Sequence, residues 1–527
     1  MLGRQEEILS FADIDNWQER IPKNSFYYRL RMWVKENLND EHFAHFYSEN
    51  IGRPSLSPTR MLTAIIIQLE KGYSDREMDE VAQFDDRVKF ALGMSRSPQS
   101  RVTHASLSNY RKMFLDDDTS RKLLKMTLQS ATAAGLFDDA DKDLVDSFMI
   151  HGATSKQDTY TLIRKAMTRV LYLSEKEGLR NQLETLLEHK EYSKKGKPKI
   201  NWDNQSDKEK LLTDLVNDAR RVKEFIQGTT VSEELKDAVN LLQLVAEQDI
   251  EEKDGQIKIR QGVAKDRVIS IKDPEMRHGR KTTSCKTDGY KGHVMTGGQD
   301  CELVISTTVT PANASDESAL EKLLEQRKEN LGQYSKKILA DTAYGGADTR
   351  QAMLDKEIIL IAKVPPASNK KDFFSKEEFI IDLNAKLVTC PAGQTVSIVP
   401  KSKKQVERAT KGIIKFPQET CKTCPLKDKC TNSKSGRTIS IHEREALLQA
   451  ARAQQQTTEF KEEYACRANV ERKIAHLTRH GARKTHLFGT VWNDFKLAIH
   501  GAITNIMTIP RLVVKYAKEK TVQPLTG

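Results

Sequence analysis

Three acidic residues stand where carboxylates could hold metal ions for phosphodiester chemistry. Asp146 lies in the apolar stretch "DLVDSFMIHG", Asp341 follows the apolar end of "KKILADTAYGG", and Glu471 lies in "YACRANVERK". Ligands commonly bind at the carboxyl ends of strands in sheets flanked by helices. Each acid alone also fits a helix cap, a turn or a solvated face. Together they predict a site for two Mg²⁺ ions about 3.5–4 Å apart, which activate a water or 3′-hydroxyl and stabilise the leaving oxygen.

The segment around Glu471 places two further polar side chains near this acid. Tyr464, Arg467 and Glu471 are three and four residues apart, so the sequence predicts that they share one helix face.

The elements that must position these acids alternate between strand-like and helical patterns. After the strand with Asp146 come two strands joined by a turn, then helix, strand, helix and strand. This order predicts a mixed α/β sheet with helices on its faces. We assign the catalytic core to residues 140–365 together with 455–516. A helical insertion, 155–260, and a Lys-rich, Cys-containing insertion, 366–440, interrupt it.

Residues 1–125 are predicted to be all helical. Ser57 and Pro58 are start signals for a helix that ends at Gly72, and Ser74 with Glu77 has the spacing of a capping box. Short helices joined by tight turns, with scattered arginines, fit a helix-turn-helix-like DNA-binding domain. They equally fit an ordinary helical bundle.

Length and charge limit the class of protein. The 527 residues suffice for about three domains. A net charge of +11 indicates a polyanionic partner such as nucleic acid, although a merely basic soluble protein remains an alternative. The first residues lack the order of a signal peptide. The longest uninterrupted apolar runs are far shorter than the ~18 residues of a membrane span. We therefore expect a soluble intracellular protein with no membrane partner.

Four of the seven cysteines fall within one polar segment. Cys390, Cys421, Cys424 and Cys430 could form a tetrahedral zinc site, and they could equally be free thiols. A second basic segment, "RHGRKTTSCKTDGYKGH", contains Arg280, Lys286 and Lys291. It is interpreted as a surface for sequence-independent phosphate contact, with a solvated hairpin as the alternative.

Several of these motifs resemble one family. The combination "LVDSFMIHG", "GYKGHV", "ADTAYGG" and "YACRANVERKIAHL" resembles the DDE transposases of bacterial insertion sequences, which have a ribonuclease-H-like catalytic core. The stretch "FYSENIGRPSLSPTRMLTAIIIQLEKGYSDREMDE" resembles the helical domain that precedes this core in one large group of them.

The resemblance implies a role for each matching residue. Asp146, Asp341 and Glu471 become the magnesium-binding catalytic triad, with manganese as a possible substitute metal. Tyr464 and Arg467 become phosphate-contacting or orienting partners of Glu471. The family often has a lysine seven residues after the glutamate, but this position is Thr478 here. The neighbouring Arg479 is the candidate substitute, and it lies ~100° further around the helix.

The resemblance also implies an activity and its partners. The protein is expected to be a DDE-type polynucleotidyl transferase that cleaves DNA at terminal inverted repeats and joins the ends to target DNA. A homodimer or larger assembly on DNA is implied, in the bacterial cytoplasm and associated with the nucleoid. Two alternatives remain open: a catalytically silent DNA-binding protein derived from such an enzyme, and a two-metal nuclease without strand transfer.

Overall fold

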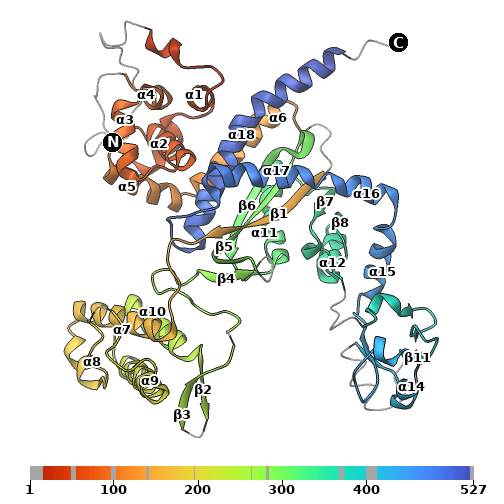
Figure 1. Cartoon of the computed structure of the whole chain (residues 1–527). Coiled ribbons are helices and arrows are strands. Elements are labelled where there is room, and N and C mark those ends of the chain that lie inside the picture. The colour runs from red at the N-terminus through yellow and green to blue at the C-terminus, as the bar shows by residue number, and fades with distance from the viewer. Residues whose placement is uncertain are drawn as a thin grey trace.

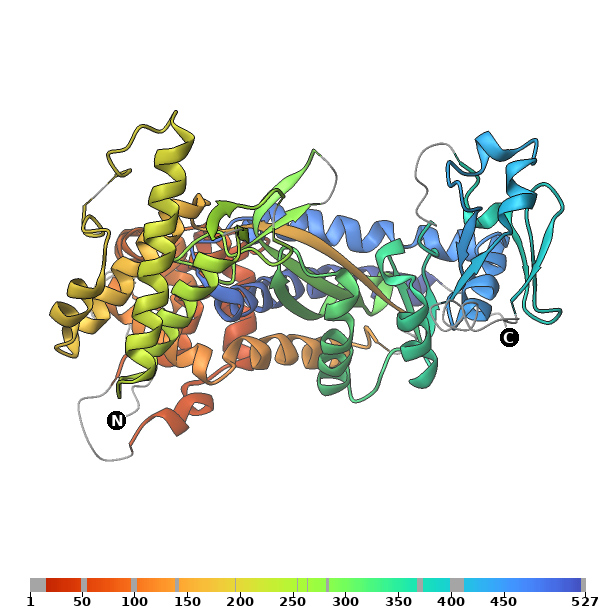
Figure 2. The ribbon, with the colours of Figure 1, turned by 90° about the horizontal axis from the view of Figure 1, so that it is seen from below.

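The computed structural model consists of a central sheet, a helical amino-terminal region and two outlying lobes (Figure 1). It describes residues 16–48, 55–95, 102–137, 142–194, 196–253, 255–262, 264–280, 284–366, 373–398 and 412–522. The two lobes lie toward opposite ends of the molecule in both views (Figures 1 and 2).

The central sheet is mixed, as the sequence predicts. Its strands are β1 (Lys142–His151), β4 (Arg277–Arg280), β5 (Lys286–Gly297), β6 (Leu303–Pro311), β7 (Lys337–Ala340) and β8 (Ile359–Ile361). β5 pairs antiparallel with β1, β4 and β6, whereas β7 pairs in parallel with both β1 and β8. β4 is a strand that the sequence analysis missed, because only four residues next to the "RKTTSC" segment form it.

Helices cover both faces of this sheet. On one face, α11 (Leu320–Leu331) and α12 (Ala347–Asp355) pack on a core that includes Val145. On the other face, α17 (Ala468–Leu477) and α18 (Gly489–Val522) pack on a core that includes Leu144. Because successive strand residues point to opposite faces, the strand β1 contributes to both cores.

The amino-terminal helices begin and end largely where the sequence predicts. Ser57 caps α2, Gly72 ends it in a left-handed conformation, and the capping box of Ser74 with Glu77 is present. These three predictions are confirmed. The helices are α1 (Phe26–Asn37), α2 (Pro58–Lys71), α3 (Asp75–Phe84), α4 (Asp86–Leu92), α5 (His104–Asp116) and α6 (Thr119–Ala133).

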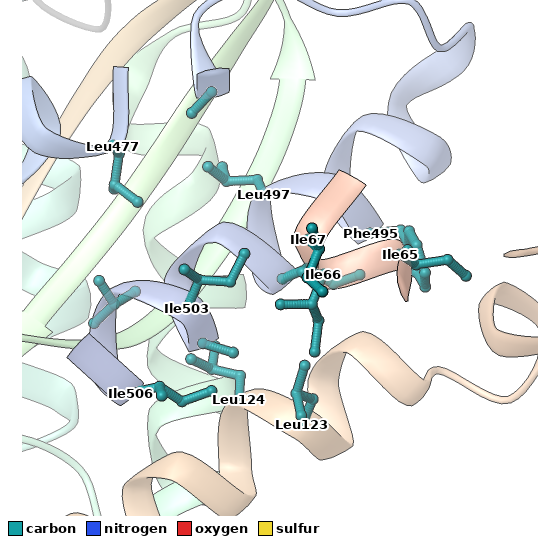
Figure 3. Close-up of a cluster of buried hydrophobic side chains, with 14 of the residues drawn as sticks. Ile65, Ile66, Ile67, Leu123, Leu124, Leu477, Phe495, Leu497, Ile503 and Ile506 are labelled. Carbon is teal, nitrogen blue, oxygen red and sulfur yellow. The ribbon is translucent and has the colours of Figure 1, made fainter. Parts of the chain in front are cut away.

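The amino-terminal helices share a hydrophobic core with the helices of the sheet. Figure 3 shows the Ile65–Ile67 side chains of α2 beside those of α6, α17 and α18. Residue 125, where we expected the first domain to end, lies inside α6. The amino-terminal region is thus packed directly onto the sheet-bearing part of the chain.

Helix α18 bears on the expectation that no segment crosses a membrane. Gly489–Lys518 is long and apolar enough, by length and composition, to cross a membrane, although no uninterrupted apolar run reached that length. However, 67% of its most apolar window is buried inside the protein, against α2, α6 and β6. These contacts are those of a core helix, since a membrane span would turn its apolar surface to lipid.

The two insertions form the outlying lobes. The first contains α7 (Thr159–Lys176), α8 (Arg180–Leu186), α9 (Gln205–Gln227), α10 (Glu233–Glu247) and the hairpin β2 (Ile250–Lys253) and β3 (Gln256–Ile259). It has its own hydrophobic core, which extends as far as Ile271. The second contains β9 (Ile380–Asp382), β10 (Leu387–Thr389), β11 (Thr395–Ser397), β12 (Ile413–Lys415), α14 (Gln418–Lys422) and β13 (Thr438–Ser440). Helices α15 (Glu445–Gln454) and α16 (Thr458–Ala465) lead back to α17.

Candidate functional site

The sheet register brings Asp146 and Asp341 to neighbouring positions. The last pair between the parallel strands β1 and β7 is Val145 with Ala340, so the two acids occupy the next position on each strand. Val145 directly precedes Asp146 and Ala340 directly precedes Asp341. Both belong to the core under α11 and α12. By alternation, Asp146 and Asp341 face the opposite side, which carries α17.

Asp341 has the capping role that the sequence left open. It is the N-cap of a short 3₁₀ turn, η6 (Thr342–Tyr344), and one carboxylate oxygen accepts a hydrogen bond from the Ala343 amide at 3.3 Å. The cap fixes the start of the turn, while the acid remains at the carboxyl end of β7.

Glu471 lies in the first turn of α17, where the helix dipole favours an acid. Helix α17 packs on the core that includes β1 through its buried face, formed by Val470, Ile474 and Leu477. The side chain of Glu471 is 60% exposed, so it projects from the helix toward solvent.

The predicted single helix through Tyr464, Arg467 and Glu471 is wrong in one detail. The helix is divided into α16, which ends at Ala465, and α17, which begins at Ala468. Cys466 and Arg467 keep right-handed helical dihedral angles across the division. Helical spacing therefore survives the break in the hydrogen-bond pattern, and the three side chains still meet.

Arg467 links the parts of this site. Its guanidinium donates to the Tyr464 hydroxyl at 3.2 Å and to Asp146 at 3.3 Å, and it lies 3.6 Å from the Glu471 carboxylate. Burial by itself lowers the pKa of Arg467, but Asp146, then Tyr464 and then Asp341 reverse this and raise it above its ordinary value. One cation thus lies among all three predicted acids.

Tyr464 is held by contacts on its ring. It stacks on the buried Phe460 with ring centroids 5.4 Å apart, and the Lys363 ammonium lies 5.0 Å from the ring centroid. Held in this way, its hydroxyl can orient Arg467 toward Asp146.

A tyrosine that the sequence analysis did not assign, Tyr344, is buried in the core under α11 and α12. Burial raises the pKa of Tyr344 well above its ordinary value, and the carboxylates of Asp316, Asp146 and Asp341 raise it further. Within the described part of the chain its hydroxyl has no hydrogen-bond partner.

Asp316 is a second residue that sequence reasoning missed. It accepts hydrogen bonds from the Ser147 hydroxyl at 3.0 Å and pairs with Lys291 at 2.7 Å. The only sequence signal was its place after Ser315 at a helix start, where an acid is ordinary. Its partner Ser147 directly follows Asp146. Asp316 therefore holds β1 by a hydrogen bond next to the first acid.

Lys291 and Arg479 are placed away from the three acids. Lys291 pairs across the strands with Met149, on the face opposite Asp146, and is ion-paired with Asp316. Arg479 is exposed in the π-helical turn η9 (Thr478–Ala482), beyond the end of α17. Neither residue contacts the triad among the contacts of the described residues.

The three carboxylates suit a hard divalent cation in donor type. Asp146 and Asp341 face the helix that carries Glu471, and Mg²⁺ prefers such oxygen ligands. Among the described residues, however, no three His, Cys, Asp or Glu side chains already stand in a metal-binding arrangement. Arg467 instead lies between Asp146 and Glu471.

The four cysteines of the second insertion lie around one cavity. All are free thiols. The pKa of Cys430 is raised, first by burial and further by the neighbouring Cys421, Cys390 and Cys424, against the opposing charge of Arg437. The four cysteines belong to one segment of the sequence, and the fold brings them around one cavity.

A basic cavity of about 850 Å³ lies along β4 and the start of β5. Lys156, Arg280 and Lys286 line it, are exposed and have no ion pair among the described residues. Arg277 and Lys291 line it too, but are paired with Asp266 and Asp316. Lys281, in the same basic segment, lies outside the described residues.

Comparison with known families gives two matches. Residues 389–509 match the family model described as "Transposase DDE domain", and residues 15–113 match the one described as "Transposase domain (DUF772)". Glu471 falls inside the first match, whereas Asp146 and Asp341 lie outside both. Searches of curated proteins and of solved structures gave no significant match. With one transposase model matched near each end, the two matches indicate a DDE transposase of an insertion sequence.

Proposed function

We propose that this transposase is a metal-dependent polynucleotidyl transferase that cleaves DNA at the ends of its element and joins them to target DNA. The observation that carries the proposal is the adjacent placement of Asp146 and Asp341 on parallel strands, facing α17 with Glu471. DDE transposases generally use divalent metal ions such as Mg²⁺.

Each residue of the site has a role in this proposal. Asp146, Asp341 and Glu471 would hold Mg²⁺, which when bound activates the attacking oxygen and stabilises the leaving one. Arg467 reduces the mutual repulsion of the carboxylates and can hold a phosphate oxygen beside them. Tyr464 orients Arg467 through its hydroxyl.

The topology supports a ribonuclease-H-like core. Three antiparallel strands, β6, β5 and β1, continue through the parallel strands β7 and β8, with helices on both faces. The acids lie on the two central neighbours β1 and β7 and on a late helix, as the resemblance implies.

The amino-terminal helices are proposed to recognise the terminal inverted repeats. Residues 15–113 match a transposase domain separate from the catalytic one. Their close packing on α18 would couple bound element ends to the catalytic core. Pairing of two ends implies a dimer or larger assembly on DNA, acting on nucleoid DNA in the bacterial cytoplasm.

A strand-transfer assay tests the proposed reaction. Purified protein is incubated with Mg²⁺, duplexes that carry the element's terminal repeats, and a supercoiled target plasmid. We expect 3′-hydroxyl ends at the element boundary and covalently joined target products. Cleavage without joining would instead indicate a two-metal nuclease, and binding without cleavage would indicate a silent DNA-binding descendant.

The basic cavity is proposed to contact DNA phosphates. Arg280→Glu with Lys286→Glu should weaken binding to duplexes of any sequence, because exposed cations release counterions from phosphates. The negative slope of log affinity against log salt should become shallower by about 0.9 for each lost phosphate contact. Fluorescence anisotropy across a salt series measures both effects.

A matched control separates the cavity from net charge. Arg169→Glu with Lys223→Glu makes the same charge change on exposed positions of α7 and α9. If both double variants lose affinity equally, the effect reflects total charge and the cavity has no special role.

A further inference from the structure

The second insertion folds around a very small hydrophobic core. Its two small β units, β9–β10–β11 and β12–β13, enclose a cluster of buried apolar side chains. The members of this cluster are Phe379, Val388, Ile414, Phe416 and Ile439. Domains of this size usually need a disulfide, a metal or a partner surface to be stable. The three thiols that pack on the cluster are Cys390, Cys421 and Cys430.

Four thiols from separate turns meet at the edge of this cluster. Cys390 follows β10, Cys421 lies in α14, and Cys424 and Cys430 follow in the next turns. All four line a single cavity, together with apolar side chains such as Phe374. They are therefore separated by up to 40 positions in the chain and gathered by the fold alone.

Tight turns hold the backbone at Cys390 and at Cys430. The Cys390 amide donates to the Gln394 carbonyl at 2.9 Å, and the Gly393 amide donates to the Cys390 carbonyl at 2.8 Å. Gly393 has φ +77°, a conformation that glycine adopts without strain. The Cys430 amide donates to the Lys427 carbonyl at 2.9 Å. Both sides of the cavity are thus built on hydrogen-bonded turns.

Two cations line the same cavity. Arg437 donates to the Cys430 carbonyl at 3.0 Å and to the Phe374 carbonyl at 2.7 Å, while Lys427 forms another part of the wall. Four thiolates around Zn²⁺ carry a net charge of −2, which two such cations offset. A cluster of neutral thiols would give these two cations no counter-charge.

We propose that Cys390, Cys421, Cys424 and Cys430 bind one structural Zn²⁺ ion that holds this module together. As they stand in the described structure, the thiols surround the cavity without forming a closed ligand set. Binding therefore requires their side chains to turn inward and lose their protons. The metal-binding free energy then contributes directly to folding of the module.

The module is anchored to the helix that leads to the catalytic glutamate. Lys376 pairs at 2.5 Å with Glu445 of α15, whose side chain is only 1% exposed. Gln449 of α15 donates to the Ile381 carbonyl at 2.8 Å. A module ordered by zinc would therefore sit against α15, two helices before α17.

Metal analysis of the full-length protein, purified without chelators, tests the proposal. Mass spectrometry of the metal content should give about one zinc per chain. The variant with Cys421→Ser and Cys424→Ser should lose this zinc, whereas Cys285→Ser should retain it, because Cys285 is exposed and outside the cavity. Replacement by Co²⁺ should give a thiolate charge-transfer band in the wild type and in Cys285→Ser only.

The wild-type measurement keeps the proposal falsifiable if a cysteine variant misfolds. Zinc-free wild-type protein that also gives no Co²⁺ thiolate band would overturn it, whether its thiols prove free or paired in disulfides. Zinc retained in the Cys421→Ser, Cys424→Ser variant would also overturn it, since the metal would then lie elsewhere.

Discussion

Asp146→Asn, Asp341→Asn and Glu471→Gln should each lower Mg²⁺-dependent cleavage of element ends by about three orders of magnitude or more, as for interdependent catalytic residues. Each change keeps the size of the side chain and removes one negative oxygen ligand. Because the three acids act as a unit, a double variant should be no worse than a single one. Cleavage of a labelled donor duplex under single-turnover conditions measures the loss.

Two controls accompany this prediction. DNA binding by the three variants, measured without metal, should remain close to wild type, since the acids are assigned to metal and not to DNA. Asp355→Asn removes an exposed carboxylate on α12, away from the site, and should leave cleavage intact. Near-normal cleavage by any triad variant would refute that residue's assignment.

Arg327→Met should destabilise the catalytic core by about 3–5 kcal/mol, the usual effect of breaking a buried ion pair. Arg327 Nε lies 2.9 Å from the Asp143 carboxylate, and both side chains are at most 5% exposed. Ser335 also donates to Asp143. The variant would leave a buried carboxylate without its cation. A Cβ at Gly297 would lie 2.1 Å from Asp143 Oδ1, so the site leaves no room for rearrangement.

Denaturant unfolding monitored by a probe in the core measures this loss. Asp143→Asn combined with Arg327→Met should cost less than the sum of the single changes, because the two residues interact directly. Arg180, 31% exposed and paired with Glu175 and Glu184, supplies the control, since Arg180→Met should cost no more than about 1 kcal/mol. Equal losses of unfolding free energy in Arg327→Met and Arg180→Met would show that burial does not strengthen the Asp143 pair.

This ion pair also bears on the catalytic site. Asp143 lies on β1, three residues before Asp146. Arg327 comes from α11, which packs on the face of the sheet opposite to α17. The pair thus attaches α11 to β1, the strand that carries Asp146. We expect Arg327→Met to lower cleavage together with stability.

The sequence by itself determined the local elements and the types of residue at the site. Capping signals at Ser57 and Ser74 depend only on nearby backbone amides, so the helix starts could be read directly. The alternation of strand and helix patterns gave the order of elements in the mixed sheet. The spacing of Arg467 and Glu471 predicted their contact, because four residues span about one helical turn.

Only the tertiary structure decided which distant residues meet. The contact between Arg467 and Asp146 joins positions 321 residues apart, and it depends on how α17 is seated over β1. The same is true of Asp316, which looked like an ordinary helix-start acid, and of the four gathered cysteines. Periodicity and capping are properties of neighbouring residues along the chain. Strand register and helix placement are set by which buried surfaces fit together, and no local pattern contains that information.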